Sequence, residues 1–125
     1  MFQKGSKVRR LTAVFALGLA FAATQVLAAD GSISLEVRCS GYLLAEMEHA
    51  RMLAKDTSRG EEYRAKMLAQ AKDFEEMMNF ALNKASAQGE KDIETKAEAI
   101  AMAYARETPQ KRAANIESCL PLFSR

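Results

Sequence analysis

From residue 29 onward, apolar side chains recur every three or four positions, and they do not alternate with polar side chains in steps of two. Spacings of three and four place side chains on one face of an α-helix, whereas a half-buried strand requires a spacing of two. This part of the chain has only four glycines and two prolines, and it is rich in the good helix formers Ala, Glu, Lys, Met and Leu. The pattern predicts an all-α fold.

The first predicted helix begins near Ser32 or Ser34 and ends near Lys55. It presents one apolar stripe, typical of a helix that packs on a core, made of Leu35, Cys39, Leu43, Met47, Ala50 and Ala54. Gly41 interrupts this helix and costs about 1 kcal/mol of helix stability relative to alanine. We expect a glycine at this position to permit the close approach of a second helix.

The second predicted helix follows a break at residues 56–60. Ser58 and Glu61 have the spacing of a capping box, which would start the helix at this point. Its apolar positions form a nearly heptad seam, namely Tyr63, Met67, Ala71, Phe74, Met78, Ala81 and Ala85. Gly89 is expected to end the helix in the left-handed conformation.

The third predicted helix begins near Lys91 or Asp92, and its apolar positions are Ile93, Ala97, Ile100 and Tyr104. Thr108 and Pro109 then supply an N-cap and a first-turn proline for a short fourth helix. The expected buried side of this helix is Ala113, Ile116 and Leu120, and Pro121 is expected to end it. Short connections favour antiparallel neighbours, so we predict a small up-down bundle of three longer helices and one short C-terminal helix.

The first 28 residues have the order of a secretory signal peptide. Residues 1–10 carry four positive charges, residues 11–23 form an apolar run, and Val26 and Ala28 occupy positions −3 and −1 of a predicted cleavage site. We therefore expect bacterial export through the general secretory route, into the periplasm or the extracellular space, and a helical domain at residues 29–125. The alternative is an uncleaved membrane anchor, because the apolar stretch approaches the length of a membrane span.

Cleavage would reverse the sign of the net charge. The whole chain has 18 basic and 16 acidic residues, a formal charge of +2, whereas residues 29–125 have 14 basic and 16 acidic residues, a formal charge of −2. A basic face is the electrostatic signature of nucleic-acid binding. We therefore expect no nucleic-acid partner. Because the long apolar run lies within the predicted signal peptide, we also expect no membrane span after cleavage.

Cys39 and Cys119 are the only cysteines of the chain. One lies early in the first predicted helix and the other at the end of the fourth, and these ends can meet in a compact bundle. An even cysteine count in an exported chain favours a disulfide, so we predict an intramolecular bond. Two buried thiols or an intermolecular bridge are the alternatives. The chain has no CxxC motif, which argues against a thiol oxidoreductase.

A carboxylate falls inside the apolar stripe of the first helix. Glu46 follows Tyr42 by four residues and precedes His49 by three, so the three side chains share one helix face. A partly buried carboxylate needs a hydrogen-bond donor, which could be the Tyr42 hydroxyl, His49 or an arginine of another helix. We expect a satisfied carboxylate at the rim of the bundle, with a small polar binding notch as the alternative. No catalytic residue is predicted.

Glu46 and His49 also have the Glu-x-x-His spacing of di-iron bundles. Such a site requires a second pair, and His49 is the only histidine. We therefore predict no metal and no other cofactor. Six methionines beyond residue 28 are interpreted as core filling, and these are Met47, Met52, Met67, Met77, Met78 and Met102.

The four residues Cys39-Ser40-Gly41-Tyr42 resemble a helix start in some small two-cysteine periplasmic immunity proteins. This resemblance keeps an immunity protein among the alternatives. The predicted function is a small exported helical protein that binds another protein, as an inhibitor, an immunity protein or a chaperone-like module, and that is not an enzyme. One alternative is a structural envelope protein that self-assembles as a homodimer through Leu44 and Met52, which lie off the apolar stripe. The other is a small enzyme.

Overall fold

The computed structural model describes residues 33–124, and all regular secondary structure within this range is helical. The elements are, in order, α2 (Leu35–Ala54), α3 (Glu61–Ala87), α4 (Ile93–Ala105), α5 (Pro109–Glu117) and α6 (Leu120–Phe123). The predicted all-α bundle of three longer helices and a short C-terminal one is confirmed, with the short helix divided in two. These helices belong to the unit Ser34–Arg125, and the predicted signal peptide lies outside the described residues.

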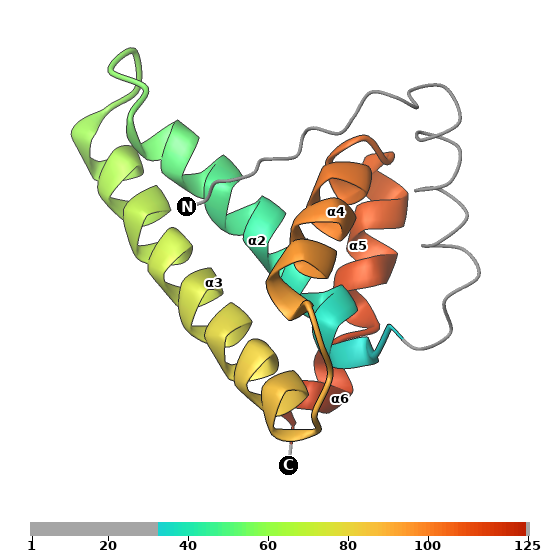
Figure 1. Cartoon of the computed structure of the whole chain (residues 1–125). Coiled ribbons are helices and arrows are strands. Elements are labelled where there is room, and N and C mark those ends of the chain that lie inside the picture. Colours follow the sequence, from blue (N-terminus) through green and yellow to red (C-terminus); the bar gives the residue numbers. More distant parts are fainter. Residues whose placement is uncertain (1–32, 125) are drawn as a thin grey trace, which may run out of the picture. The chain divides into compact units, whose positions relative to one another are not determined.

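α2 is the central helix of this unit. It packs along α3 on one side and against α4 on another, and α3 and α4 barely touch each other (Figure 1). Its predicted apolar stripe is buried or half-buried throughout, and Cys39 and Leu43 are almost completely inaccessible. Leu44 and Met52 lie off this stripe, so α2 has apolar residues on more than one side, as is typical of a helix that lies between neighbours.

Polar contacts near both ends of the α2–α3 pair show that the two helices are antiparallel. Arg51, near the end of α2, bonds to Glu75 at 3.3 Å, whereas Glu36, at the start of α2, accepts from Gln88 after α3 at 3.3 Å. Ser34 caps α2, because its hydroxyl accepts the backbone N–H of the third helical residue at 3.1 Å.

Gly41 lies where α2 meets α4. A β-carbon at this position would lie 2.6 Å from Cγ2 of Ile100 and 2.8 Å from the carbonyl oxygen of Ala97, far inside ordinary contact distance. The expected close approach is therefore confirmed. One turn further along both helices, Glu46 meets Tyr104. The residue numbers of the paired positions increase together along the two helices, so α2 and α4 run in the same direction.

The start of α3 differs from the prediction. Gly60 is its N-cap and no side chain caps it. Ser58 instead donates its hydroxyl and its backbone N–H to Oδ1 of Asp56, at 2.6 and 3.0 Å. This local turn competes with helix capping, so the predicted capping box is wrong. The predicted seam of α3 does face the core, and its fully buried members are Met67, Ala71, Ala81 and Ala85. Gly89 follows α3 at φ +84°, as predicted.

The C-terminal segment ends its first helix earlier than predicted. α5 begins at Pro109, capped by Thr108 as expected, but it ends at Glu117 rather than near Leu120. Pro121 accounts for the difference, because a proline ring clashes with the carbonyl four residues before it, here that of Glu117. A single further turn, α6, follows.

The inward face of α5 also differs from the prediction. Ala113 and Leu120 are exposed rather than buried, and Leu120 retains 59% of its accessible surface. Two polar residues turn inward in their place. Arg112 donates to the backbone carbonyl of Glu107 at 2.5 Å, and Asn115 donates to the Glu107 carboxylate at 2.7 Å. Both bonds tie α5 to Glu107, in the connection between α4 and α5.

Cys39 and Cys119 form a disulfide, with their Cα atoms 5.9 Å apart. Both residues are buried. The bond ties the first turns of α2 to the junction between α5 and α6 and closes a loop of 80 residues. The intramolecular pairing predicted from the sequence is therefore present.

Candidate functional sites

Glu46 is half-buried on α2, and its carboxylate pairs with a residue of α4. The hydroxyl of Tyr104 donates to Oε2 of Glu46 at 2.5 Å, and Tyr104 itself is buried. The ring of Tyr42 lies against that of Tyr104, with centroids 5.1 Å apart. The donor observed for Glu46 is therefore Tyr104, which is not among the donors expected from the sequence.

Beside this pair lies a small cavity of about 240 Å³, at the position of the predicted binding notch. Glu46 and His49 line it together with Ala45, Tyr104, Ala105 and Arg112. Tyr42 is not among the lining residues and touches the site through the ring of Tyr104. The exposed His49 side chain makes no hydrogen bond or ion pair within residues 33–124. The three predicted notch residues are thus brought near one cavity but do not form one hydrogen-bonded cluster.

The Tyr104 phenol acts as a donor in this site. Burial, followed by the hydrogen bond to Glu46, raises the pKa of Tyr104 far above its ordinary value of 10.0. Burial also raises the pKa of Tyr42. Both phenols therefore stay protonated at neutral pH and cannot serve as bases there. The Tyr104–Glu46 bond fixes α4 against α2 and closes one wall of the cavity.

Replacing Tyr104 by phenylalanine is expected to lower the free energy of unfolding by about 1–3 kcal/mol at neutral pH, because Glu46 loses its donor. A phenol whose pKa is raised by folding contributes stability that is complete below pH 10.0 and is lost as the pH rises through the folded pKa. Urea unfolding of the wild type and Tyr104→Phe should therefore converge as the pH rises above about 10. Tyr63→Phe on α3 is the control. A gap that widens with pH would contradict this assignment.

A larger hollow of about 670 Å³ lies between α2 and α4, and we call it the methionine groove. Its apolar lining consists of Leu44, Ala45, Met52, Ala101, Met102 and Ala105. Met52 and Met102 retain 63% and 62% of their accessible surface. Core filling is therefore the wrong interpretation for these two methionines, although Met47 and Met67 are buried.

The charged residues of the methionine groove have one sign. Glu48 lines it from α2 and Glu98 from α4, and both are exposed. The lining includes no lysine or arginine, and His49 is its third titratable residue. An apolar floor between carboxylates is complementary to an apolar surface that carries positive charges.

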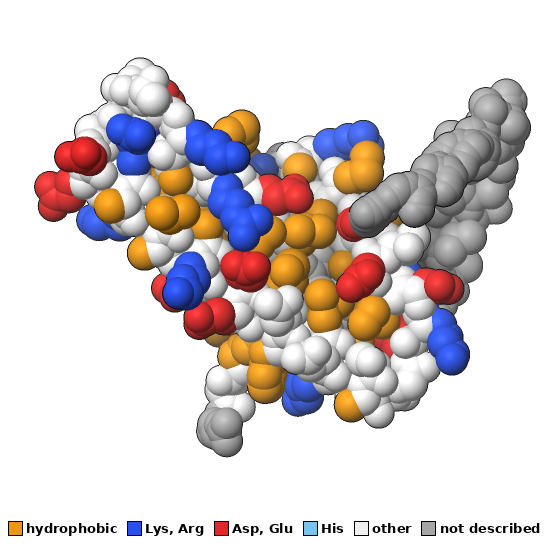
Figure 2. All heavy atoms as spheres, turned by 60° about the vertical axis from the view of Figure 1, so that its left-hand side comes forward, with side chains coloured by type: hydrophobic (Ala, Val, Ile, Leu, Met, Phe, Trp, Pro, Cys, Tyr) orange, Lys and Arg blue, Asp and Glu red, His pale blue; other side chains and the backbone are white. Residues whose placement is uncertain are grey.

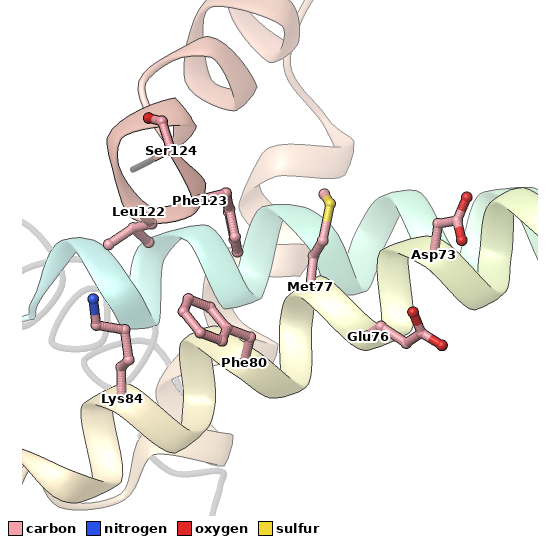
Figure 3. Close-up of a pocket in the computed structure, with 8 residues that line it drawn as sticks. All are labelled: Asp73, Glu76, Met77, Phe80, Lys84, Leu122, Phe123 and Ser124. Atoms are coloured by element: carbon pink, nitrogen blue, oxygen red, sulfur yellow. The ribbon is translucent and has the colours of Figure 1, made fainter.

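A third hollow, of about 760 Å³, lies between α3 and α6, and we call it the aromatic pocket (Figure 3). Phe80 of α3 and Phe123 of α6 both line it and pack against each other, with ring centroids 5.7 Å apart. Met77 and Leu122 complete its apolar wall. Phe80 retains 46% of its accessible surface, so the pocket presents an aromatic ring to its surroundings.

Within residues 33–124, no three His, Cys, Asp or Glu side chains gather as a metal site would require, and no helix is both long and apolar enough to cross a membrane. The chain matches no protein-family model, and no curated protein or solved structure is significantly similar to it. Because fold alone does not define function, the function of this chain has to be inferred from its surfaces and cavities.

Proposed function

We propose that this protein is an exported binding module whose methionine groove takes a positively charged amphipathic helix of a partner protein. The observation that carries the proposal is the composition of the groove. Two large, mostly exposed methionine side chains, Met52 and Met102, lie in the groove, and its charged residues Glu48 and Glu98 are both negative. Exposed apolar patches with polar rims mark interaction sites in soluble proteins.

The geometry of the groove favours a helix as the ligand. α2 and α4 run in the same direction and approach closely at Gly41, so the methionine groove is a furrow between two neighbouring helices. A third helix can pack into such a groove through apolar side chains that are spaced by three and four residues. Methionine is flexible and polarizable, so Met52 and Met102 can adapt to the shape of the apolar anchors.

The charges of the groove favour lysine and arginine on the ligand. Glu48 and Glu98 stand on opposite walls, where each can pair with a basic residue beside the apolar stripe of a bound helix. Complementary charges of this kind increase association rates and specificity. The same carboxylates would repel the anionic lipids of a membrane surface, so the groove is suited to a protein segment rather than to a lipid.

Two further observations support export. The sequence begins with the pattern of a signal peptide, and the Cys39–Cys119 disulfide is typical of an oxidising compartment such as the periplasm. Inhibitors, immunity proteins and chaperone-like modules all bind other proteins, so the proposed groove is compatible with each of these classes.

The probe for the proposal is a synthetic amphipathic helix with a leucine face and a lysine face, labelled for fluorescence anisotropy. A twin peptide with glutamate in place of lysine tests the charge. We expect the lysine peptide to bind about tenfold more tightly than its twin, a difference of about 1.4 kcal/mol. Equal binding of both peptides, or binding of neither, would overturn the proposal.

A pair of matched variants locates the binding site. Met52→Ser combined with Met102→Ser is expected to weaken binding of the lysine peptide by about tenfold or more, since buried apolar anchors dominate such interfaces. Leu68→Ser is the control, because Leu68 is similarly exposed, at 60%, but lies outside the groove. An equal loss in both proteins would place the binding elsewhere.

A further inference from the structure

We infer that two copies of this chain associate through the outer face of α3, with the two α3 helices antiparallel and Phe80 near the two-fold axis. The face consists of Asp73, Met77, Phe80 and Lys84, at spacings of four, three and four residues, with Glu76 one turn before Phe80. These spacings place all five side chains on one side of the helix, next to the seam that faces the core.

The charges on this face are separated and unpaired. Figure 3 shows Lys84 at one end of the aromatic pocket and Asp73 and Glu76 at the other, with the apolar side chains between them. Within the described residues, neither carboxylate makes a hydrogen bond or an ion pair. The Lys84 ammonium lies 5.6 Å from the centroid of the Phe80 ring and has no carboxylate partner there. The face thus carries both signs of charge without internal neutralisation.

An antiparallel second copy neutralises these charges by symmetry. Phe80 stands midway between Glu76 and Lys84, four residues from each, which is about 6 Å along the helix axis. When two α3 helices cross at Phe80 in opposite directions, Lys84 of each copy lies opposite the acidic end of the other. Such an isologous interface uses the same surface twice and closes as a dimer.

The centre of this face is apolar, as a dimer interface requires. Phe80 is 46% exposed and Met77 is half-buried. Within each copy Phe80 packs against Phe123, and the apolar surface beside this pair in the aromatic pocket is available to the Phe80 ring of the second copy. Aromatic pairs gain stability beyond their buried area. Figure 2, in which the left-hand side of Figure 1 comes forward, shows exposed hydrophobic side chains with acidic and basic side chains among them.

The charge pattern favours a second copy at this face and a different partner at the methionine groove. The groove carries two carboxylates and no lysine or arginine, so two grooves would repel each other. Leu44, expected in a homodimer seam with Met52, is half-buried and packs against the core cluster that includes Met47. The α3 face, by contrast, is complementary to itself.

The test uses charge-reversal variants of the α3 face, first alone and then mixed. Dimerisation of the purified proteins is measured by sedimentation equilibrium. Lys84→Glu alone, and Asp73→Lys with Glu76→Lys, should each weaken the dimer by about tenfold or more, because like charges then face each other. An equal mixture of the two variants should regain a heterodimer of near wild-type affinity. Lys72→Glu, an exposed residue outside this face, should leave dimerisation unchanged.

Several results would overturn the inference. These are a monomeric wild type at every concentration, a dimer that is insensitive to both reversals, and a mixture that fails to recover. Circular dichroism of each variant confirms that these exposed substitutions leave the helices folded. Binding of the lysine peptide to the methionine groove is measured on the same variants and should not change, so failure of the dimer and failure of the proposed function are distinguishable.

Discussion

Reduction of the Cys39–Cys119 disulfide is expected to lower the free energy of unfolding by about 4–5 kcal/mol, the value that loop-closure entropy gives for a long loop. The loop in question spans 80 residues. Small domains have a total free energy of unfolding of about 5–15 kcal/mol, so this bond supplies a large part of the stability. It does so by holding the start of α2 against the end of α5.

Thermal unfolding with and without reductant measures this effect, and we expect a large fall in the melting temperature. Cys39→Ala and Cys119→Ala should each reproduce it, and the double variant should be no worse than either, because both substitutions remove one shared interaction. A melting temperature that reductant leaves unchanged would contradict the expected contribution. Two reactive thiols per chain in the denatured, non-reduced protein would contradict the bond itself.

Gly41→Ala is expected to destabilise the protein by about 1–3 kcal/mol, the usual cost of overpacking, although alanine favours a helix by about 1 kcal/mol. The reason is the contact with α4. The new β-carbon would lie 2.6 Å from Ile100 and 2.8 Å from a backbone carbonyl oxygen. A side chain can rotate away, but the carbonyl can move only with its helix, so α4 must shift.

Urea unfolding of Gly41→Ala against the wild type measures the cost. Gly60→Ala is a matched control, because a β-carbon at Gly60 meets nothing within 4 Å, and its effect should stay below about 1 kcal/mol. A Gly41→Ala protein as stable as the wild type would show that α2 and α4 do not need this close approach.

The helices and their buried faces could be predicted because they depend on local periodicity. The seams through Leu43 of α2, Ala71 of α3 and Ile100 of α4 all face the core. The caps predicted at Gly89 and Thr108 are present for the same reason, whereas the capping box predicted at Ser58 is absent. The capping box failed because Asp56, two residues before Ser58, offers the serine hydroxyl an acceptor. Residue spacing alone does not show which of two local hydrogen bonds is the more stable.

The partners within the candidate sites could be predicted only in part, because they depend on how separate helices align. Helical geometry located Glu46 inside the apolar stripe, but its donor Tyr104 lies 58 residues away. A tyrosine at the end of an apolar stripe, with its polar tip in need of a partner, was the available signal. The exposure of Met52 and Met102 likewise depends on where α4 ends along α2, which no local pattern specifies.

Methionine methyl NMR can locate the binding site, because methionines report on the groove, the core and the α3 face within one spectrum. The purified protein, labelled at its methionine methyl groups, is titrated with the lysine-faced amphipathic peptide. We predict that the resonances of Met52 and Met102, which line the groove, shift strongly, whereas those of the buried Met47 and Met67 and of Met77 in the aromatic pocket change little. A titration that shifts Met77 while leaving Met52 and Met102 unchanged, or that shifts none of them, would contradict the methionine groove as the binding site.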